Sequence, residues 1–86
     1  MKKYFLLYDL CNPGKNYAAL YEIVHQFDCM KICDSAWAIK TNFSAQQVCD
    51  KFSSVIDSND IFFVAEYSGN GFAFNLSPSV INWLNT

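Results

Sequence analysis

The residue whose position in this sequence most suggests chemistry is Asp9. It follows a run of five large apolar residues, Tyr4 to Tyr8, and is itself followed within a few positions by Pro13-Gly14, a pair that favours a turn. A carboxylate at the end of an apolar strand has two interpretations. It can accept hydrogen bonds from the N–H groups of the following turn. Alternatively, if two copies of the chain bring their acids together, the pair can hold a hard divalent cation such as Mg²⁺ or Mn²⁺.

Lysines are the basic residues that could contact a phosphate group, because the chain has six lysines and no arginine. Lys15, Lys31 and Lys40 are the candidates, and a dimer would double them. Three lysines per subunit, doubled in a dimer, suit a small nucleotide or a short single strand rather than duplex DNA. The alternative is that these side chains are simply solvated.

Three other side chains could contact the same ligand. Ser35 could donate to a phosphate oxygen, Trp37 could stack on a base, and Tyr8 could direct its hydroxyl at a bound group. Each also has a structural interpretation, because a serine at a strand bend often satisfies its own backbone and an aromatic in an apolar strand often belongs to a core or a subunit contact. His25 has no second histidine near it, and we expect it at the surface or the core boundary.

The length and composition of the chain limit the kind of protein that can carry these residues. A chain of 86 residues forms a single domain, spanning 1–86, because it is too short to supply two cores. It is 52% hydrophobic and 17% aromatic, which is more apolar side chain than a small monomer hides easily. We therefore expect a homodimer. The net charge of −2 and the absence of arginine disfavour duplex DNA as a partner.

The four cysteines predict free thiols. There is no Cys-x-x-Cys pair, and Cys29 and Cys33, if they lie on one strand, would be about 13 Å apart, too far for a disulfide. No run approaches about 18 apolar residues and no targeting segment is visible, so no membrane partner is expected. These features favour the reducing cytoplasm.

Hydrophobic periodicity and capping residues predict the elements that position these side chains. In chain order they are strand 3–9, helix 17–28, a hairpin over 29–40 that bends at Asp34-Ser35, a helix opened by Ser44, strand 61–67, a short strand 71–76, and a helix opened by Ser77-Pro78. The order predicts an α+β fold, a ferredoxin-like βαββαβ sandwich with a short C-terminal strand and helix. Because the first strand is apolar on both faces, we expect helices on one face of the sheet and a second subunit on the other.

Three motifs also resemble those of a known family in their order and spacing. They are YDL at 8–10, KICDSAWAI at 31–39 and IDSNDIFFVAEYSG at 56–69. Together they resemble the small CRISPR-associated protein Two family and, more loosely, its relatives the virulence-associated D toxins, over residues 4–69. The chain is also similar to short, often phage-encoded relatives without a CRISPR context.

The resemblance implies a ferredoxin-like homodimer that handles phosphodiesters. In that family an aspartate at the end of the first strand lies near the two-fold axis and is assigned to a divalent metal used in nuclease activity, and Asp9 matches its position. Ser35 and Trp37 match the serine and the aromatic of the second motif, and Lys31 stands where an arginine is usual. The arginines that normally follow the first strand are absent, and residues 11–16 replace them.

Two classes of function follow. The first is an enzyme, a metal-dependent endoribonuclease or phosphodiesterase with Asp9 as its catalytic and metal-binding residue. The second is a non-catalytic binding module, such as a phage counter-defence protein that sequesters a nucleotide signal or a host protein. The missing arginines, the acidic balance and the aromatic surplus favour the second. Both describe a small homodimer, and we expect it to bind a nucleotide or nucleic acid, with hydrolysis left open.

Overall fold

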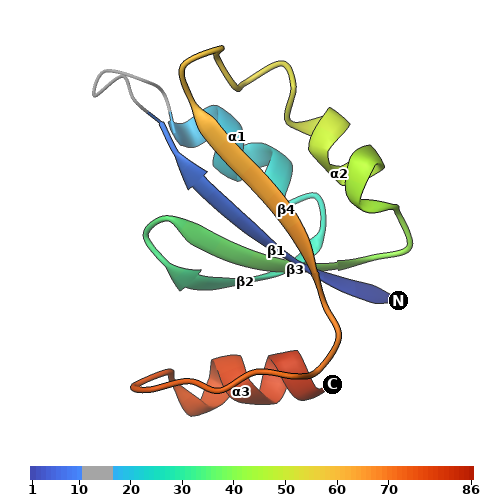
Figure 1. Cartoon of the computed structure of the whole chain (residues 1–86), viewed down its shortest axis with the longest axis vertical. Helices are drawn as coiled ribbons and strands as arrows, with labels where there is room; N and C mark the ends of the chain where they lie inside the picture. The colour runs from blue at the N-terminus through green and yellow to red at the C-terminus, as the bar shows by residue number, and fades with distance from the viewer. Residues whose placement is uncertain (11–16) are drawn as a thin grey trace.

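Four strands form one antiparallel sheet in the computed structural model of the chain, which describes residues 1–10 and 17–86. The elements are β1 (Lys2–Asp9), α1 (Tyr17–Val24), β2 (Asp28–Cys33), β3 (Ala36–Thr41), α2 (Ala45–Lys51), β4 (Ile61–Tyr67) and α3 (Pro78–Asn85). The strand order is β2-β3-β1-β4, and each neighbouring pair is antiparallel. The part of the chain described here is therefore an α+β fold with a four-stranded antiparallel sheet and three helices (Figure 1).

From Tyr4 to Tyr8, every second side chain of the central strand β1 is buried under the helices α1 and α2. Successive side chains of a strand point to opposite faces, and Tyr4, Leu6 and Tyr8 are buried on the face that carries α1 and α2. Phe5, Leu7 and Asp9 belong to the other face. Strands β3 and β4 pair with β1 on its two sides, which explains why an almost entirely apolar sequence is found here.

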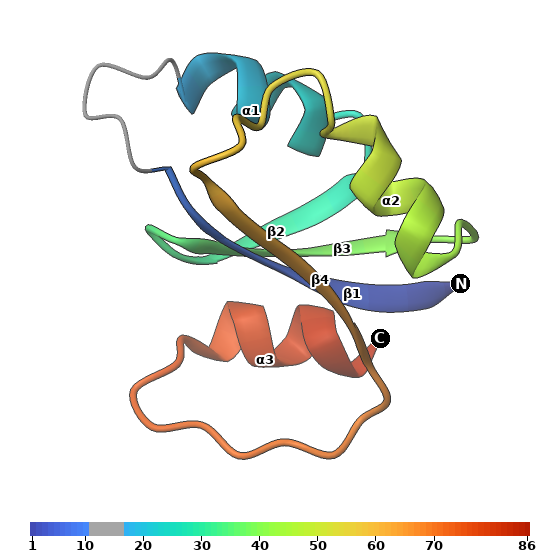
Figure 2. The same ribbon diagram turned by 45° about the horizontal axis from the view of Figure 1, so that its top comes forward.

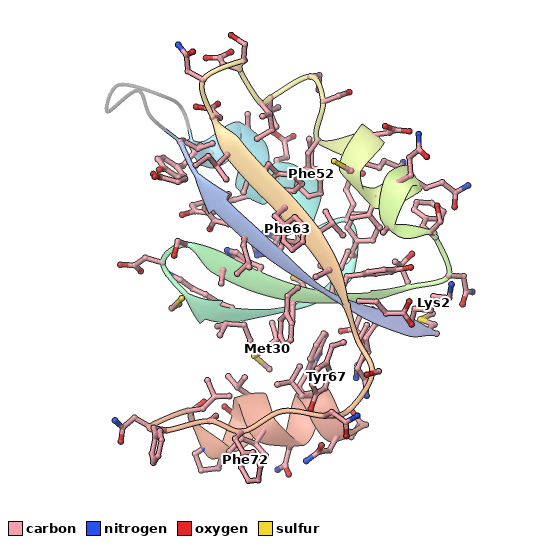
Figure 3. The ribbon with its side chains drawn as sticks, viewed as in Figure 1. Lys2, Met30, Phe52, Phe63, Tyr67 and Phe72 are labelled. Atoms are coloured by element: carbon pink, nitrogen blue, oxygen red, sulfur yellow. The ribbon has the colours of Figure 1, made fainter. Side chains whose placement is uncertain are left out.

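The larger core lies between the sheet and the pair α1–α2. Leu20 of α1, Val48 of α2 and Phe52 at the end of α2 are at most 1% exposed. The Phe52 ring packs on Phe62 of β4 with centroids 4.7 Å apart (Figure 3). Tyr4 places its ring in the same core and donates its hydroxyl to the carbonyl of Phe43 at 2.7 Å.

The other face of the sheet is partly covered by α3 of the same chain, so the helices are not confined to one face as expected. Figure 2 shows the sheet between α1–α2 on one side and α3 on the other. Val80 and Leu84 of α3 pack with Ala38 of β3, which is fully buried. Met30 and Tyr67 extend from the sheet towards this helix and join the same cluster (Figure 3). A short amphipathic helix is enough to bury this part of the face.

Polar contacts fix the C-terminal end of α3 against the sheet. Lys3 Nζ donates to the carbonyl of Leu84 at 2.5 Å, and Lys40 Nζ donates to Thr86 Oγ1 at 2.7 Å. The Lys40 ammonium also lies 4.3 Å from the ring centre of Trp83, whose Nε1 donates to Asp28 Oδ1 at 3.2 Å. Cations at the C-terminal end of a helix interact favourably with its unpaired carbonyls and its dipole.

The predicted strand at 71–76 does not form. Residues 71–76 carry no strand or bridge, and the segment passes along α3 rather than joining the sheet (Figures 1 and 2). Phe72 and Phe74 are 109% and 97% exposed, and Asn75 has a φ of 61°, in the left-handed region that interrupts an extended chain. The alternating pattern of GFAFNL predicted a strand, but no sheet edge pairs with the segment in this chain.

The helix starts and the hairpin are confirmed. Ser44 caps α2 in a capping box with Gln47, and Ser77 caps α3 with Pro78 in its first turn. The β2–β3 hairpin turns at Asp34-Ser35, with a shift of register after Lys31. Helix α1 ends at Val24, earlier than predicted, and turn hydrogen bonds carry the chain to Phe27.

Part of the α3 face of the sheet stays uncovered. Leu7, Ile61 and Phe63 are 44%, 61% and 57% exposed. Leu7 pairs with Phe63, and Ile61 pairs with Asp9, so the three side chains lie side by side on β1 and β4. We call Leu7, Ile61 and Phe63 the uncovered patch.

Among residues 1–10 and 17–86, no helix has the length and apolar character needed to cross a bilayer.

The packing of α3 leads to a first prediction. Leu84→Ala should lower the free energy of unfolding by about 2 to 5 kcal/mol, because it leaves a cavity against the sheet, and Leu84 is only 8% exposed. Ile81→Ala on the same helix should cost about half of that or less, since Ile81 is 42% exposed. Urea unfolding measures both. Equal losses in the two variants would contradict the docking of α3.

Candidate functional site

Four of the predicted ligand residues meet at the β2–β3 turn. The Tyr8 N–H donates to the carbonyl of Ser35 at 3.0 Å, and the Tyr8 hydroxyl donates to the carbonyl of Asp34 at 3.0 Å. Lys31 lies 3.4 Å from Asp34 Oδ1, and Trp37 is the cross-strand partner of Lys31. We call Tyr8, Lys31, Asp34, Ser35 and Trp37 the turn cluster. The end of β1 and the hairpin bring these residues together although they are distant in sequence.

The outer part of the turn cluster is open to solvent. Ser35 is exposed, and among the described residues its hydroxyl has only the Cys33 sulfur within reach, at 4.0 Å. The side chains of Lys31 and Asp34 are 51% and 104% exposed, so their ion pair is weak and leaves the ammonium free to contact another anion. Lys31 and Ser35 therefore remain accessible to a phosphate group.

The inner part of the turn cluster is packed. Trp37 is 9% exposed and lies against the rings of Tyr21 and His25 of α1, with centroids 5.9 and 5.3 Å away. This packing favours the core interpretation of Trp37 over base stacking. Its Nε1 is buried and has no hydrogen-bond partner among the described residues. His25 is exposed, as expected, and its Nδ1 is 2.7 Å from the carbonyl of Tyr21.

A column of aromatic rings links the turn cluster to α1, and sequence reasoning did not identify it as a unit. The ring centroids of Tyr8, Tyr17, Tyr21 and Trp37 follow one another at 6.2, 6.1 and 5.9 Å. The spacing of Tyr17, Tyr21 and His25 by four residues was the available signal, since it places all three on one side of a helix. Burial and the neighbouring Tyr21 raise the pKa of Tyr8 above its ordinary value of 10.0.

Asp9 lies on the opposite face of the sheet from Tyr8. It is exposed at the end of β1, next to Ile61 of the uncovered patch. The described residues contain no group of three or more His, Cys, Asp or Glu side chains that could hold a metal ion. A metal at Asp9 would therefore need ligands beyond the described residues of one chain, such as those of a second copy or of the bound molecule.

Two of the sequence predictions fall outside the described residues. Lys15 belongs to the segment 11–16, and so does the turn from Asn12 to Gly14 whose N–H groups the capping interpretation of Asp9 would use. Lys40, a third candidate phosphate contact, is described, and it is bound to the C-terminal end of α3 through Thr86 and the ring of Trp83.

Comparisons with known proteins give no match: no family model, no curated protein and no solved structure is similar to this chain. A proposal for its function therefore depends on the arrangement of Asp9, the uncovered patch and the turn cluster.

The burial of Tyr8 leads to a second prediction. Because the pKa of Tyr8 is raised in the folded protein, the unfolded chain loses this proton first as the pH rises. The free energy of unfolding should therefore fall as the pH rises above about 10. In Tyr8→Phe the fall should be shallower, although the variant also loses the hydrogen bond to Asp34. Urea unfolding at several alkaline pH values measures the slope, and an unchanged slope in Tyr8→Phe would contradict the assignment.

Proposed function

We propose that the chain is a small homodimeric protein that binds a nucleotide or single-stranded nucleic acid through a divalent cation held by two copies of Asp9. One observation carries this proposal: the exposed carboxylate of Asp9 lies beside an exposed apolar patch on the same face of the sheet. The patch supplies a reason for two chains to associate, and its position determines where the two acids would lie.

The uncovered patch fits an interface between two copies. In a dimer with two-fold symmetry the same surface is used by both subunits. Leu7 and Phe63 would be shielded from water, and burying such side chains is the main favourable term in association. Because Asp9 follows Leu7 by two residues on the same face, an axis that passes close to the patch would bring the two carboxylates near each other.

Paired carboxylates would suit Mg²⁺ or Mn²⁺. Such a cation takes oxygen ligands and keeps several waters, so two carboxylates would leave positions for a phosphate oxygen and for water. If the cation also activates one of the waters, a phosphodiester could be cut. The protein would then be a metal-dependent endoribonuclease or phosphodiesterase.

The positions of the described lysines, away from Asp9, favour binding over hydrolysis. Of the lysines that the structure describes, Lys3 and Lys40 are bound to the end of α3, whereas Lys31 lies in the turn cluster on the other face of the sheet from Asp9. Phosphoryl transfer depends on groups that stabilise the charge of the transition state, and few are placed to do so here. A non-catalytic binding module, such as a phage protein that sequesters a nucleotide signal, therefore remains the second candidate.

The finer fold assignment belongs to the same proposal. Counted from the other edge, the strand order is β4-β1-β3-β2, and α1 and α2 lie on one face of the sheet. Each of these helices connects two strands that are separated in the sheet by one antiparallel strand. These features support a ferredoxin-like domain with α3 added on the second face, and they agree with the resemblance to the CRISPR-associated protein Two family.

A cytoplasmic location is part of the proposal. Cys29, Cys33 and Cys49 are free thiols, and two of them are exposed. Exposed thiols persist where the environment is reducing.

The interface can be tested with one substitution on the uncovered patch. Phe63→Glu places a charge at the centre of the proposed interface and should weaken dimerisation by at least about 100-fold. Phe74→Glu is the matched control, because Phe74 is 97% exposed and lies outside the patch. Sedimentation equilibrium measures both variants. A monomeric wild-type protein, or equal association in the two variants, would overturn the proposed dimer.

The role of Asp9 can be tested separately. Asp9→Asn keeps the size of the side chain and removes its charge, so the dimer should form as before while Mn²⁺ binding is lost. Asp34→Asn is the control, because Asp34 is exposed at the β2–β3 turn and is not a proposed metal ligand. Calorimetric titration with Mn²⁺ and cleavage of single-stranded RNA in its presence are the readouts. Unchanged Mn²⁺ affinity in Asp9→Asn would refute the metal site.

A further inference from the structure

A second candidate binding site lies at the opposite end of the sheet from Asp9. The start of β1, the start of β2 and the end of β3 meet there (Figure 1). A cleft of about 370 Å³ opens at this end. We call it the basal cleft, and the side chains that matter are Phe27, Asp28, Lys40, Asn42, Phe43 and Lys51. Its volume falls within the range of small-molecule sites, which begins at about 300 Å³.

Two aromatic rings form a wall of the basal cleft. Phe27 and Phe43 pack edge to face, with centroids 6.0 Å apart and planes at 88°. Both rings are only partly buried, so part of their surface faces the cleft. The backbone of Phe43 is held in place, because its carbonyl accepts from the Tyr4 hydroxyl and its N–H donates to Thr41 Oγ1 at 3.2 Å. Because the two planes are nearly perpendicular, a flat ligand ring can stack on the face of one phenylalanine and meet the edge of the other.

Positive charge is concentrated at the same end. Four of the five lysines that the structure describes, Lys2, Lys3, Lys40 and Lys51, are found here, and Lys2 is labelled in Figure 3. Lys51 lies over the ring of Phe43, 5.5 Å from its centre, and forms no ion pair with any described residue. Lys40 lines the cleft beside Asp28, but its ammonium is bound to Thr86 Oγ1 and lies over the ring of Trp83. Among the described residues, Lys51 is therefore the cation available beside the two rings.

The remaining polar groups narrow the class of ligand. Asn42 can donate and accept hydrogen bonds, and the Asp28 carboxylate can accept from a hydroxyl or an amino group but repels a phosphate. Asp28 already accepts from Trp83 at one oxygen, which leaves further acceptor positions. The ligand that satisfies this lining carries an anionic group for Lys51, a flat ring for the phenylalanines, and hydrogen-bond donors for Asp28.

We propose that the basal cleft binds a nucleoside monophosphate unit, either as a free nucleotide or as the end of a single strand, with Lys51 on the phosphate and the base against Phe27 and Phe43. This inference rests on the proposed function for its class of ligand, but it uses none of the same residues. Because β1 is eight residues long, the cleft and Asp9 are separated by about 23 Å along the strand. The two sites can therefore fail independently.

The test uses the full chain, labelled with ¹⁵N, and follows backbone amide shifts during titration. The probes are adenosine and uridine 5′-monophosphates, the corresponding dinucleotides, inorganic phosphate and the free nucleosides. Amides of Phe27, Asn42, Phe43 and Lys51 should shift with the nucleotides. Lys51→Gln should weaken binding about tenfold, as expected for one charge-assisted contact. Lys51→Arg should stay close to the wild type. Lys2→Gln, an exposed lysine at the same end that does not line the cleft, is the matched control and should change the dissociation constant much less.

Each outcome has a defined meaning. Tighter binding of the mononucleotides indicates a free nucleotide, tighter binding of the dinucleotides indicates the end of a strand, and both support the site. Equal affinity for inorganic phosphate and for the nucleotides overturns the proposal, because the aromatic wall would then contribute nothing. Binding that Asp9→Asn abolishes and Lys51→Gln leaves intact overturns the basal cleft while the site at Asp9 stands. The reverse pattern supports the basal cleft and shows that these probes bind without Asp9.

Discussion

The structure depends on the burial of β1 between two apolar layers. Its alternating side chains serve two cores, because Tyr4, Leu6 and Tyr8 pack under α1 and α2, whereas Phe5 packs towards α3. A strand that must be dry on both faces has to lie inside the sheet, and β3 and β4 pair with it on its two sides. The order of the sheet and the three-layer arrangement follow from this constraint. Leu7 is the exception on this strand, because α3 leaves it 44% exposed.

The docking of α3 also decides which charges are available for function. Lys3 and Lys40 are drawn to the C-terminal end of this helix, and Asp28 accepts the indole N–H of Trp83. Of the five lysines that the structure describes, four lie at the basal end, while Asp9 at the other end lies beside apolar side chains. The proposed phosphate-binding role and the proposed cation-binding role therefore use different ends of one sheet.

Much of the fold was predictable because its signals are local. The capping box at Ser44, the proline after Ser77 and the turn at Asp34-Ser35 each depend on neighbouring residues, and all three are found as expected. The segment 71–76 has the alternation of a strand, but a strand also needs an edge to pair with, and sequence pattern contains no information about one. The turn cluster was predicted only as separate residues. The hydrogen bonds from Tyr8 to Asp34 and Ser35 make it a unit.

The sequence by itself determined the type and order of most elements and the apolar character of the central strand, because periodicity and capping act over a few residues. Tertiary structure decided what covers the second face of the sheet, which lysines stay free, and that Trp37 is packed between Tyr21 and His25. These outcomes depend on contacts between residues far apart in the chain, such as Lys3 with Leu84. Such contacts form only when the helices and the sheet pack together. The local pattern of a sequence does not show which distant residue a side chain will contact.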